Sequence, residues 1–291
     1  MPHQPDTIVE YPAGALSSRG TVLATLPLPE GLGVVLDRTA VHAVDAGWPD
    51  QPADRGLLAA HPIRDAIVGA IDGAADGGDI LIGRDIPVRT GADGWSFVVV
   101  HVLDPDAAVQ VGDDVEVTVD ARYRRALSAG HTACHLASLA LDAALAAAWT
   151  KEVPADALGA PGFDALACAS SRIHEFGSTD VYRVGKSLRK RGFDAASLDQ
   201  LDAVEDAANA RLAEWVATGA GIRIDRDGDG LGDRRRWVCE LPGGDAVIPC
   251  GGTHLTSLGE LAAVRVELAR EDVEGGIALT MTTTATPAAQ A

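Results

Sequence analysis

Two short motifs far apart in the chain constrain its fold more than any other feature. His131-Thr-Ala-Cys-His135 lies in a stretch whose apolar residues recur with helical spacing, so its two histidines stand one turn apart on one helix face. Cys250-Gly-Gly-Thr-His254 follows a strand-like run, and its two glycines let the backbone turn tightly. Three imidazoles and one thiolate form a tetrahedral set that favours zinc over magnesium or calcium. We therefore expect one zinc ion on His131, His135, Cys250 and His254, with the two segments brought together by the fold.

Each motif by itself also has a simpler interpretation. A pair of histidines on a helix often serves as surface or core residues, and a Gly-rich turn can carry a buried cysteine and an incidental histidine. The occurrence of both pairs in one chain favours the metal site, because together they complete a ligand set.

The spacing of apolar residues predicts an α+β fold in two parts. Residues 1–120 are β-rich, with short Val- and Ile-rich runs at 33–36, 80–82, 96–102 and 115–119, and they suggest a small barrel-like domain. Within this part, residues 65–75 are expected to form a short helical turn. Residues 121–285 are expected to form an α+β domain that carries the metal site, and residues 286–291 a mobile tail.

The second part is expected to contain two helices among several strands. Helical spacing covers residues 121–149, and because Gly130 interrupts it, we expect the first helix to begin near that glycine. A second helix is expected at 197–218. Strands are expected at 221–224, 236–240, 246–249, 261–268 and 277–284.

The charge balance argues against indiscriminate nucleic-acid binding. The chain has 42 acidic and 24 basic residues, a formal net charge of -18, whereas phosphate contacts need clustered Lys and Arg. A tRNA partner is compatible with this balance if the basic residues gather on one face. The Ala- and Leu-rich stretch 133–149 is shorter than the roughly 20 apolar residues of a membrane span. With no secretory pattern and no evident disulfide framework among four cysteines, we expect a cytoplasmic protein without a membrane partner.

The two motifs also carry a resemblance to a known family. HTACHL followed by CGGTH resembles the metal-binding signature of the alanyl-tRNA synthetase editing domain, and is especially similar to that of the free-standing AlaX trans-editing proteins. Arg124 stands seven residues before the first motif histidine, as in the family. VVVHVLD and VGDDVEVTVDARYRR resemble the strand-rich stretch that leads into the family's metal helix, and VVLDRT with QPADRG resembles its barrel motif. The resemblance covers about residues 34–285.

The resemblance implies a zinc-dependent deacylase that acts in trans, since no aminoacylation domain precedes the motifs. Its substrate is then the ester of a tRNA mischarged with a hydroxy amino acid, of the seryl-tRNA(Ala) type. A zinc ion can polarise the ester carbonyl or lower the pKa of the attacking water. Four firm protein ligands normally make a closed structural site, so we expect one ligand to be absent or labile. No Glu lies beside either motif, so the sequence indicates no general base.

The sequence departs from the family in the loop near the amino-acid pocket. Where the family has GGGQP, this chain has GWPDQP at residues 47–52, which keeps only the Gln-Pro end. Gln51 and Trp48 of this loop, with Thr132 and Thr253 beside the ligands, are the expected pocket residues. The altered loop leaves open a threonine analogue such as fluorothreonine, against which some actinobacterial members that resemble this chain protect.

Two groups of basic residues are candidates for tRNA contacts. The densest basic cluster of this acidic chain comprises Lys186, Arg189, Lys190 and Arg191. It either grips phosphates of the acceptor stem or forms a solvated helix end. Arg124 and Arg125 either place the terminal adenosine near the metal or simply flank the helix. Of the other candidates, Cys134 is a substitute ligand or a packing residue, and the Asp-rich loop at 225–233 is a calcium site or an acidic turn.

Two other classes of function remain open from the sequence. One is a non-catalytic zinc protein that binds tRNA or another partner, which four firmly bound ligands favour. The other is a zinc hydrolase that acts on a small molecule, which the net negative charge favours.

Overall fold

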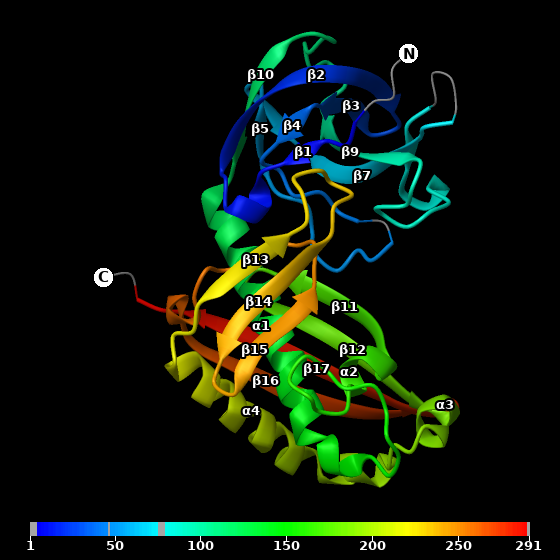
Figure 1. Ribbon diagram of the computed structural model, residues 1–291, viewed down its shortest axis with the longest axis vertical. Helices are drawn as coiled ribbons and strands as arrows, with labels where there is room; N and C mark the ends of the chain where they lie inside the picture. Colours follow the sequence, from blue (N-terminus) through cyan, green and yellow to red (C-terminus); the bar gives the residue numbers. More distant parts are fainter. Residues whose placement is uncertain (1–4, 46, 75–78, 290–291) are drawn as a thin grey trace. The chain divides into compact units, whose positions relative to one another are not determined.

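The computed structural model describes residues 5–45, 47–74 and 79–289, and its secondary structure is mixed, with many strands and few helices. This agrees with the α+β class. Contacts within the chain divide it into two units, which are described separately (Figure 1). The first unit comprises Met1–Arg124, Ile224–Arg236 and Pro249–Thr253. The second unit comprises Arg125–Arg223, Trp237–Ile248 and His254–Ala291.

The first unit is built on a curled antiparallel sheet of eight strands in the order β6-β5-β10-β2-β3-β9-β7-β8 (Figure 1). These strands are β2 (Ser17–Leu28), β3 (Gly31–Leu36), β5 (Gly56–Leu58), β6 (His61–Ile63), β7 (Asp65–Asp72), β8 (Leu81–Ile82), β9 (Trp95–Leu103) and β10 (Asp114–Val119). The short strands β1 (Ile8–Val9) and β4 (Arg38–Thr39) pair in parallel. Small apolar side chains from alternate strand positions form the core, and among them Val34, Leu36 and Val99 are fully buried.

Residues 65–72 form the strand β7, so the helical turn expected at 65–75 is wrong. β7 pairs with β9 along its whole length. Every second residue is buried, namely Ala66, Val68 and Ala70, which is the period of a strand. The small and acidic residues of this run have low intrinsic strand preference, and pairing with β9 overrides it. Residue 75 lies outside the described residues.

The second unit combines a long helix with a four-stranded antiparallel sheet in the order β11-β12-β17-β16. These strands are β11 (Cys168–His174), β12 (Gly177–Gly185), β16 (Leu261–Val273) and β17 (Gly276–Pro287). The helices are α1 (Ala121–Ala144), whose first four residues are grouped with the first unit, α2 (Phe163–Ala167), α3 (Lys186–Lys190) and α4 (Leu201–Ala217). A further sheet has the order β13-β14-β15, with β13 (Ile222–Arg226), β14 (Arg235–Leu241) and β15 (Gly244–Pro249).

Short 3-10 helices occur in both units. The first unit has η1 (Tyr11–Ala13) and η2 (Gly83–Asp85), and the second has η3 (Ala146–Ala148), η4 (Ala195–Gln200) and η5 (Leu258–Glu260).

Helix α1 begins at Ala121, earlier than the start expected near Gly130. Asp120 caps it, because its Oδ1 accepts the backbone N–H groups of the second and third helical residues, each at 3.0 Å. Gly130 has a different role. A Cβ atom there would lie 2.4 Å from the carbonyl oxygen of His174 and 2.6 Å from that of Gly177. The glycine therefore lets the turn between β11 and β12 approach the helix closely.

The second expected helix is confirmed as α4, which follows η4. Its apolar face is buried through Val204, Ala208, Leu212 and Trp215. At the C-terminal end, β17 runs to Pro287, so it includes two residues of the expected tail at 286–291. Residues 290–291 lie outside the described residues. No helix in the described part of the chain is long and apolar enough to cross a membrane.

Candidate metal centre

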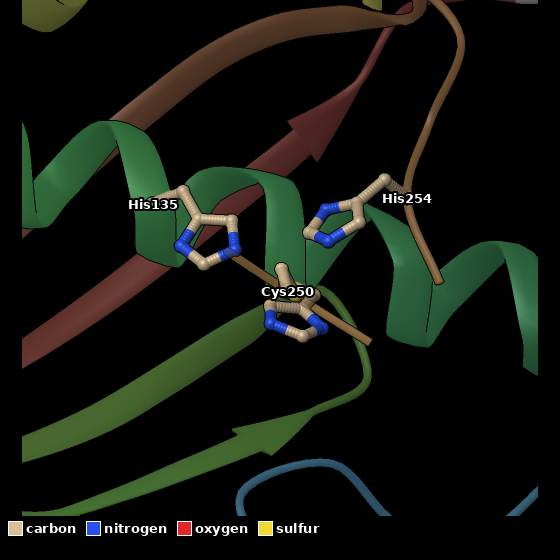
Figure 2. A group of neighbouring side chains, drawn as sticks. His135, Cys250 and His254 are labelled. Atoms are coloured by element: carbon tan, nitrogen blue, oxygen red, sulfur yellow. The ribbon is translucent and has the colours of Figure 1, made fainter. Parts of the chain in front are cut away.

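Three histidines of the second unit gather around one point. α1 carries His131 and His135 one turn apart, and their ring centroids lie 4.8 Å apart. The ring of His254, from the segment after β15, lies 4.3 Å from that of His131 and 5.0 Å from that of His135. Figure 2 shows the rings of His135 and His254 beside α1, turned toward the same space. The helical spacing of the first motif thus places both of its imidazoles next to the third.

Cys250 completes the group of candidate ligands. Each of the four side chains of His131, His135, Cys250 and His254 offers one donor atom, and these atoms all lie within 4.8 Å of one another (Figure 2). The donor atoms around a tetrahedral zinc ion stand about 3.3–3.8 Å apart, as follows from the usual bond lengths. The structure therefore brings together the four residues that the sequence proposes as ligands.

The chemistry of these donors suits a zinc ion. Burial lowers the pKa of His135 to about 4, so its imidazole is neutral at neutral pH and offers a lone pair. Its Nε2 atom is buried and makes no hydrogen bond within the described residues, a cost that a bound cation would remove. Burial raises the pKa of Cys250 to about 12, opposed by a hydrogen bond from the backbone N–H of Gly252. Metal binding at Cys250 therefore has to displace the thiol proton.

Thr132, which is fully buried, orients one of the ligands. Its Oγ1 lies 3.3 Å from Nδ1 of His254 and accepts the backbone N–H of Leu255 at 3.1 Å. When Nδ1 carries the proton and donates to this oxygen, the lone pair on Nε2 of His254 is left for a metal. Thr132 therefore contacts the metal group through His254.

Trp237 of β14 also borders the histidines, although no sequence motif identifies it. Its ring centroid lies 5.1 Å from that of His135 and 5.9 Å from that of His254. The side chain is fully buried, and its Nε1 makes no hydrogen bond within the described residues. Alternation along the strand predicts that this position faces inward, but no motif links a single tryptophan to a metal site.

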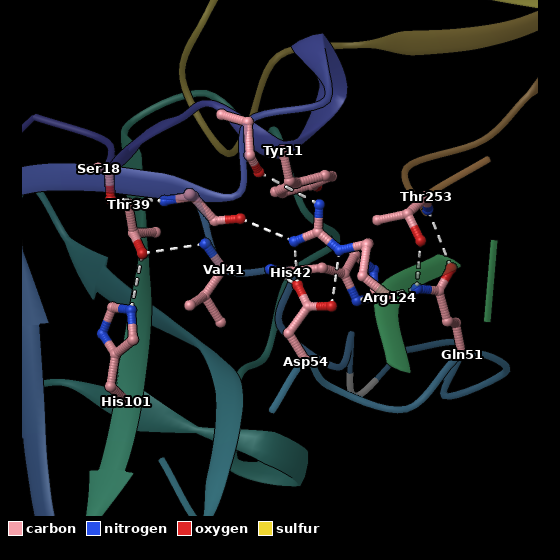
Figure 3. Close-up of polar contacts among 12 residues, drawn as sticks. Tyr11, Ser18, Thr39, Val41, His42, Gln51, Asp54, His101, Arg124 and Thr253 are labelled. Carbon is pink, nitrogen blue, oxygen red and sulfur yellow. Dashed lines mark hydrogen bonds and ion pairs between the residues drawn. The ribbon is translucent and has the colours of Figure 1, made fainter. Parts of the chain in front are cut away.

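Within the first unit, Gln51 holds the turn that carries Cys250 (Figure 3). Its side-chain Nε2 donates to Oγ1 of Thr253 at 2.9 Å, and its Oε1 accepts the backbone N–H of Thr253 at 3.0 Å. The hydroxyl of Tyr11 donates to the carbonyl of Gly251 at 2.8 Å. Gln51 and Thr253 are 2% and 4% exposed, so their hydrogen bonds are shielded from water. The glutamine of the altered loop thus fixes the backbone of the second motif.

Arg124 forms a buried ion pair with Asp54 in the first unit (Figure 3). Its Nε donates to one oxygen of Asp54 at 2.7 Å, and Nη2 donates to the other. Nη2 also donates to the carbonyl of Ala40 at 2.8 Å, and the backbone N–H of His42 donates to Asp54 at 2.6 Å. The two charged side chains are 7% and 0% exposed. The guanidinium is therefore engaged inside the protein, where it offers little surface to a nucleic acid.

The other expected contact residues are exposed. Trp48 is 51% exposed. Arg125 is 41% exposed at its side chain and pairs with Glu260 at 3.4 Å. The basic cluster at α3 and the residue that follows it is exposed at Lys186, Arg189, Lys190 and Arg191. These side chains can therefore reach a partner in solution.

Cys134 is a packing residue, one of the two roles that the sequence left open. Its Sγ lies 3.6 Å and 3.7 Å from the carboxylate oxygens of Asp180, within hydrogen-bond distance. Burial raises the pKa of its thiol well above the usual value. It does not join the four-residue group of candidate ligands.

The acidic loop at 225–233 is neutralised in part by its own arginines. Asp227 pairs with Arg236 at 2.6 Å, and Asp229 pairs with Arg226 at 3.3 Å. Among the described residues, the histidine and cysteine group is the one set with the donors of a metal site. Two aspartates of the loop are therefore engaged in ion pairs, one with an arginine of the loop and one with Arg236 just beyond it.

Comparison with known proteins agrees with the motifs. No family model matches the chain. It is 27% identical over 266 residues to an alanine–tRNA ligase of Nocardioides sp., a match that covers 90% of this chain and 25% of that protein. It is 24% identical over 243 residues to the alanyl-tRNA editing protein AlaX-M of Pyrococcus horikoshii, covering 84% of this chain and 82% of that protein. The chain is a homologue of the alanyl-tRNA synthetases and of AlaX-M.

The extent of these matches differs between the two kinds of relative. The alanine–tRNA ligase of Frankia alni is 28% identical over 265 residues, and the match covers 24% of its length. The chain thus spans about a quarter of the length of the synthetases it matches, whereas it spans most of AlaX-M. The resemblance to AlaX-type editing proteins drawn from HTACHL and CGGTH is confirmed.

Proposed function

We propose that this protein is a zinc-dependent deacylase that hydrolyses the ester of a tRNA mischarged with a hydroxy amino acid, of the seryl-tRNA(Ala) type. The observation that carries the proposal is the convergence of three imidazoles and a thiol in a homologue of AlaX-M. The printed name of AlaX-M describes an alanyl-tRNA editing protein. We also propose that the protein acts in trans and in the cytoplasm, a proposal that the homology to AlaX-M supports.

His131, His135, Cys250 and His254 are the proposed zinc ligands. A zinc ion, when bound there, polarises the ester carbonyl or lowers the pKa of the attacking water. The protein's own contribution is to hold the donors in place. α1 fixes two imidazoles, Thr132 orients His254, and Gln51 fixes the turn of Cys250 through Thr253. Catalysis requires that one of the four ligands be labile, since four firm ligands make a closed structural site.

The substrate is proposed to contact both the pocket residues and the exposed basic residues. Gln51, Trp48, Thr132 and Thr253 are the proposed pocket residues. Phosphates of the tRNA are proposed to bind the exposed cluster at α3, with Arg125 as a further contact. The buried pairing of Arg124 gives that residue a supporting role for the first unit.

The acyl group has a second candidate. Trp48 replaces a glycine of the family's loop, and this bulk favours a different acyl group, a threonine analogue such as fluorothreonine. Parallel assays with seryl, threonyl and fluorothreonyl esters decide between the two.

The test of the proposed function combines metal analysis with ester hydrolysis. The purified protein is assayed on seryl-, threonyl- and alanyl-tRNA with and without a chelator, and its zinc content is measured. We expect hydrolysis of a hydroxyacyl ester that stops on chelation and in His135→Ala. His174→Ala, an exposed histidine of the same unit, is the matched control and keeps activity. Zinc binding without hydrolysis of any ester indicates the non-catalytic alternative, and hydrolysis that survives chelation contradicts metal dependence.

A further inference from the structure

Two buried nitrogen atoms that find no hydrogen-bond partner among the described residues belong to neighbouring side chains in the second unit. One is Nε2 of His135 and the other is Nε1 of Trp237. The two rings are in contact, with centroids 5.1 Å apart, and Trp237 also lies 5.9 Å from His254. Trp237 is fully buried, so water does not reach its N–H freely.

A metal ion accounts for only one of these two atoms. The imidazole nitrogen of His135 is a lone-pair donor to metals, whereas the indole N–H can only donate a hydrogen bond. A buried donor without an acceptor is costly, and a phenylalanine at this position would pack against the histidines without that cost. Trp149 has the same kind of buried indole N–H, but only that of Trp237 belongs to a ring that borders His135 and His254, so it is the one placed to donate to a molecule bound at the histidines.

The neighbouring groups narrow the identity of that acceptor. The amino-acid part of an ester held at the histidines brings a carbonyl oxygen, an α-ammonium and, in a hydroxy amino acid, a side-chain oxygen. The carbonyl oxygen is the atom that a Lewis acid polarises, and an ammonium offers no acceptor. The side-chain hydroxyl is left as the partner of the indole N–H.

We propose that Trp237 determines acyl specificity by donating its indole N–H to the side-chain hydroxyl of the substrate's amino acid. This inference rests on the proposed function and adds the residue that reads the acyl group. A deacylase of seryl esters must spare alanyl esters, which differ by one oxygen. A site built to hydrogen-bond that oxygen rejects the analogue that lacks it far more strongly than a purely apolar pocket can. The hydrophobic face of the indole, packed on His135 and His254, holds the donor in a fixed place.

The kinetic test uses Trp237→Phe, which keeps an aromatic ring and removes the donor. Trp149→Phe is the matched control, because the Nε1 of Trp149 is also buried and unpaired within the described residues, but its ring packs on Phe193. We expect the ratio of kcat/KM for seryl over alanyl esters to fall about tenfold or more in Trp237→Phe. We expect the ratio to stay unchanged in Trp149→Phe, and the zinc content to stay unchanged in both.

A binding test is independent of turnover. The chain has five tryptophans, so indole N–H resonances in ¹⁵N spectra are few. A non-hydrolysable seryl amide of 3′-aminoadenosine should move the Trp237 resonance downfield, and the alanyl amide should leave it nearly in place. If Trp237→Phe does not fold, replacing the other tryptophans one at a time by phenylalanine assigns the remaining resonance. The titration of the wild-type protein then tests the inference without the Trp237→Phe variant.

Three results overturn the inference. If Trp237→Phe loses activity equally on seryl and alanyl esters, the indole N–H donates to the ester carbonyl. If Trp237→Phe loses zinc and Trp149→Phe does not, the ring of Trp237 supports the metal ligands. An indole resonance that ignores both amides excludes a contact with the acyl group. A wild-type protein that hydrolyses neither ester contradicts the proposed function, and the titration still decides whether Trp237 reads a hydroxyl.

Discussion

Gln51→Leu tests whether the buried amide in the first unit supports the metal-binding turn. Both ends of the Gln51 amide bond to Thr253, at 2.9 Å and 3.0 Å, and Thr253 lies between Cys250 and His254 in the sequence. Leucine has a similar volume but no polar group, so it removes both bonds to Thr253 and the 3.4 Å contact of Nε2 with Nδ1 of His42. The substitution therefore separates the polar contacts of Gln51 from its packing.

The magnitude follows from the number and burial of these bonds. Two hydrogen bonds contribute about 0.5–1.5 kcal/mol each, and a buried donor left without its acceptor costs about 1–3 kcal/mol. The buried N–H of Thr253 loses such an acceptor, so Gln51→Leu should lower the free energy of unfolding by about 2–6 kcal/mol. Because the freed backbone carries two ligands, zinc affinity should fall about tenfold or more, as for other residues that support ligands.

Two measurements check this expectation. Urea unfolding followed by circular dichroism gives the stability loss, and competition with a coloured zinc chelator gives the affinity. Gln110→Leu, at an exposed glutamine of the same unit, is the matched control and should change neither quantity. A change below about 0.5 kcal/mol in Gln51→Leu, the range of ordinary surface substitutions, with unchanged zinc affinity would refute the supporting role.

Three further predictions address other buried and exposed charges. Asp54→Asn leaves the guanidinium of Arg124 buried without its counter-charge, so urea unfolding should show a loss of about 3–5 kcal/mol. Burial raises the pKa of Asp142 from 3.8 to about 8, opposed by a hydrogen bond from the backbone N–H of Asp164. The folded state therefore holds the Asp142 proton more tightly than the unfolded state does. The free energy of unfolding should fall as the pH rises from about 4 to about 8, by up to about 1.4 kcal/mol per pH unit. Asp142→Asn should flatten this pH dependence, as measured by urea unfolding. Lys186→Glu should raise the KM for aminoacyl-tRNA severalfold and leave kcat unchanged in steady-state assays, whereas an unchanged KM would place the tRNA elsewhere.

The sequence indicated the metal group because metal binding imposes spacing rules within short segments. The helical repeat alone places His131 and His135 on one side of α1, and the glycines of the second motif let Cys250 and His254 converge. Donor chemistry then joins the two segments without knowledge of the fold. Such rules act over four or five residues, which is why these candidates could be named in advance.

Other features depend on contacts that no local rule specifies. Trp237 lies beside His135 because β14 happens to pass there, and a single inward-facing tryptophan has many ordinary roles. Gly130 interrupts a helical pattern in sequence, but its cause is the turn between β11 and β12, which lies more than forty residues later. Local preference also misassigned residues 65–72, because the pairing partner β9 supplies the stability of that strand.

The altered loop at 47–52 shows which part of a motif carries structure and which part can change. Gln51 is 2% exposed and bonds twice to Thr253, so the retained end of the loop is the end that supports the second motif. Trp48 is 51% exposed, so the substituted end lies at the surface of the first unit. The departure from the family's glycine-rich loop therefore leaves the support of Cys250 intact. A change in acyl group through Trp48 is then compatible with an unchanged metal site, and the effects of Trp48→Gly should appear in substrate preference and spare zinc affinity.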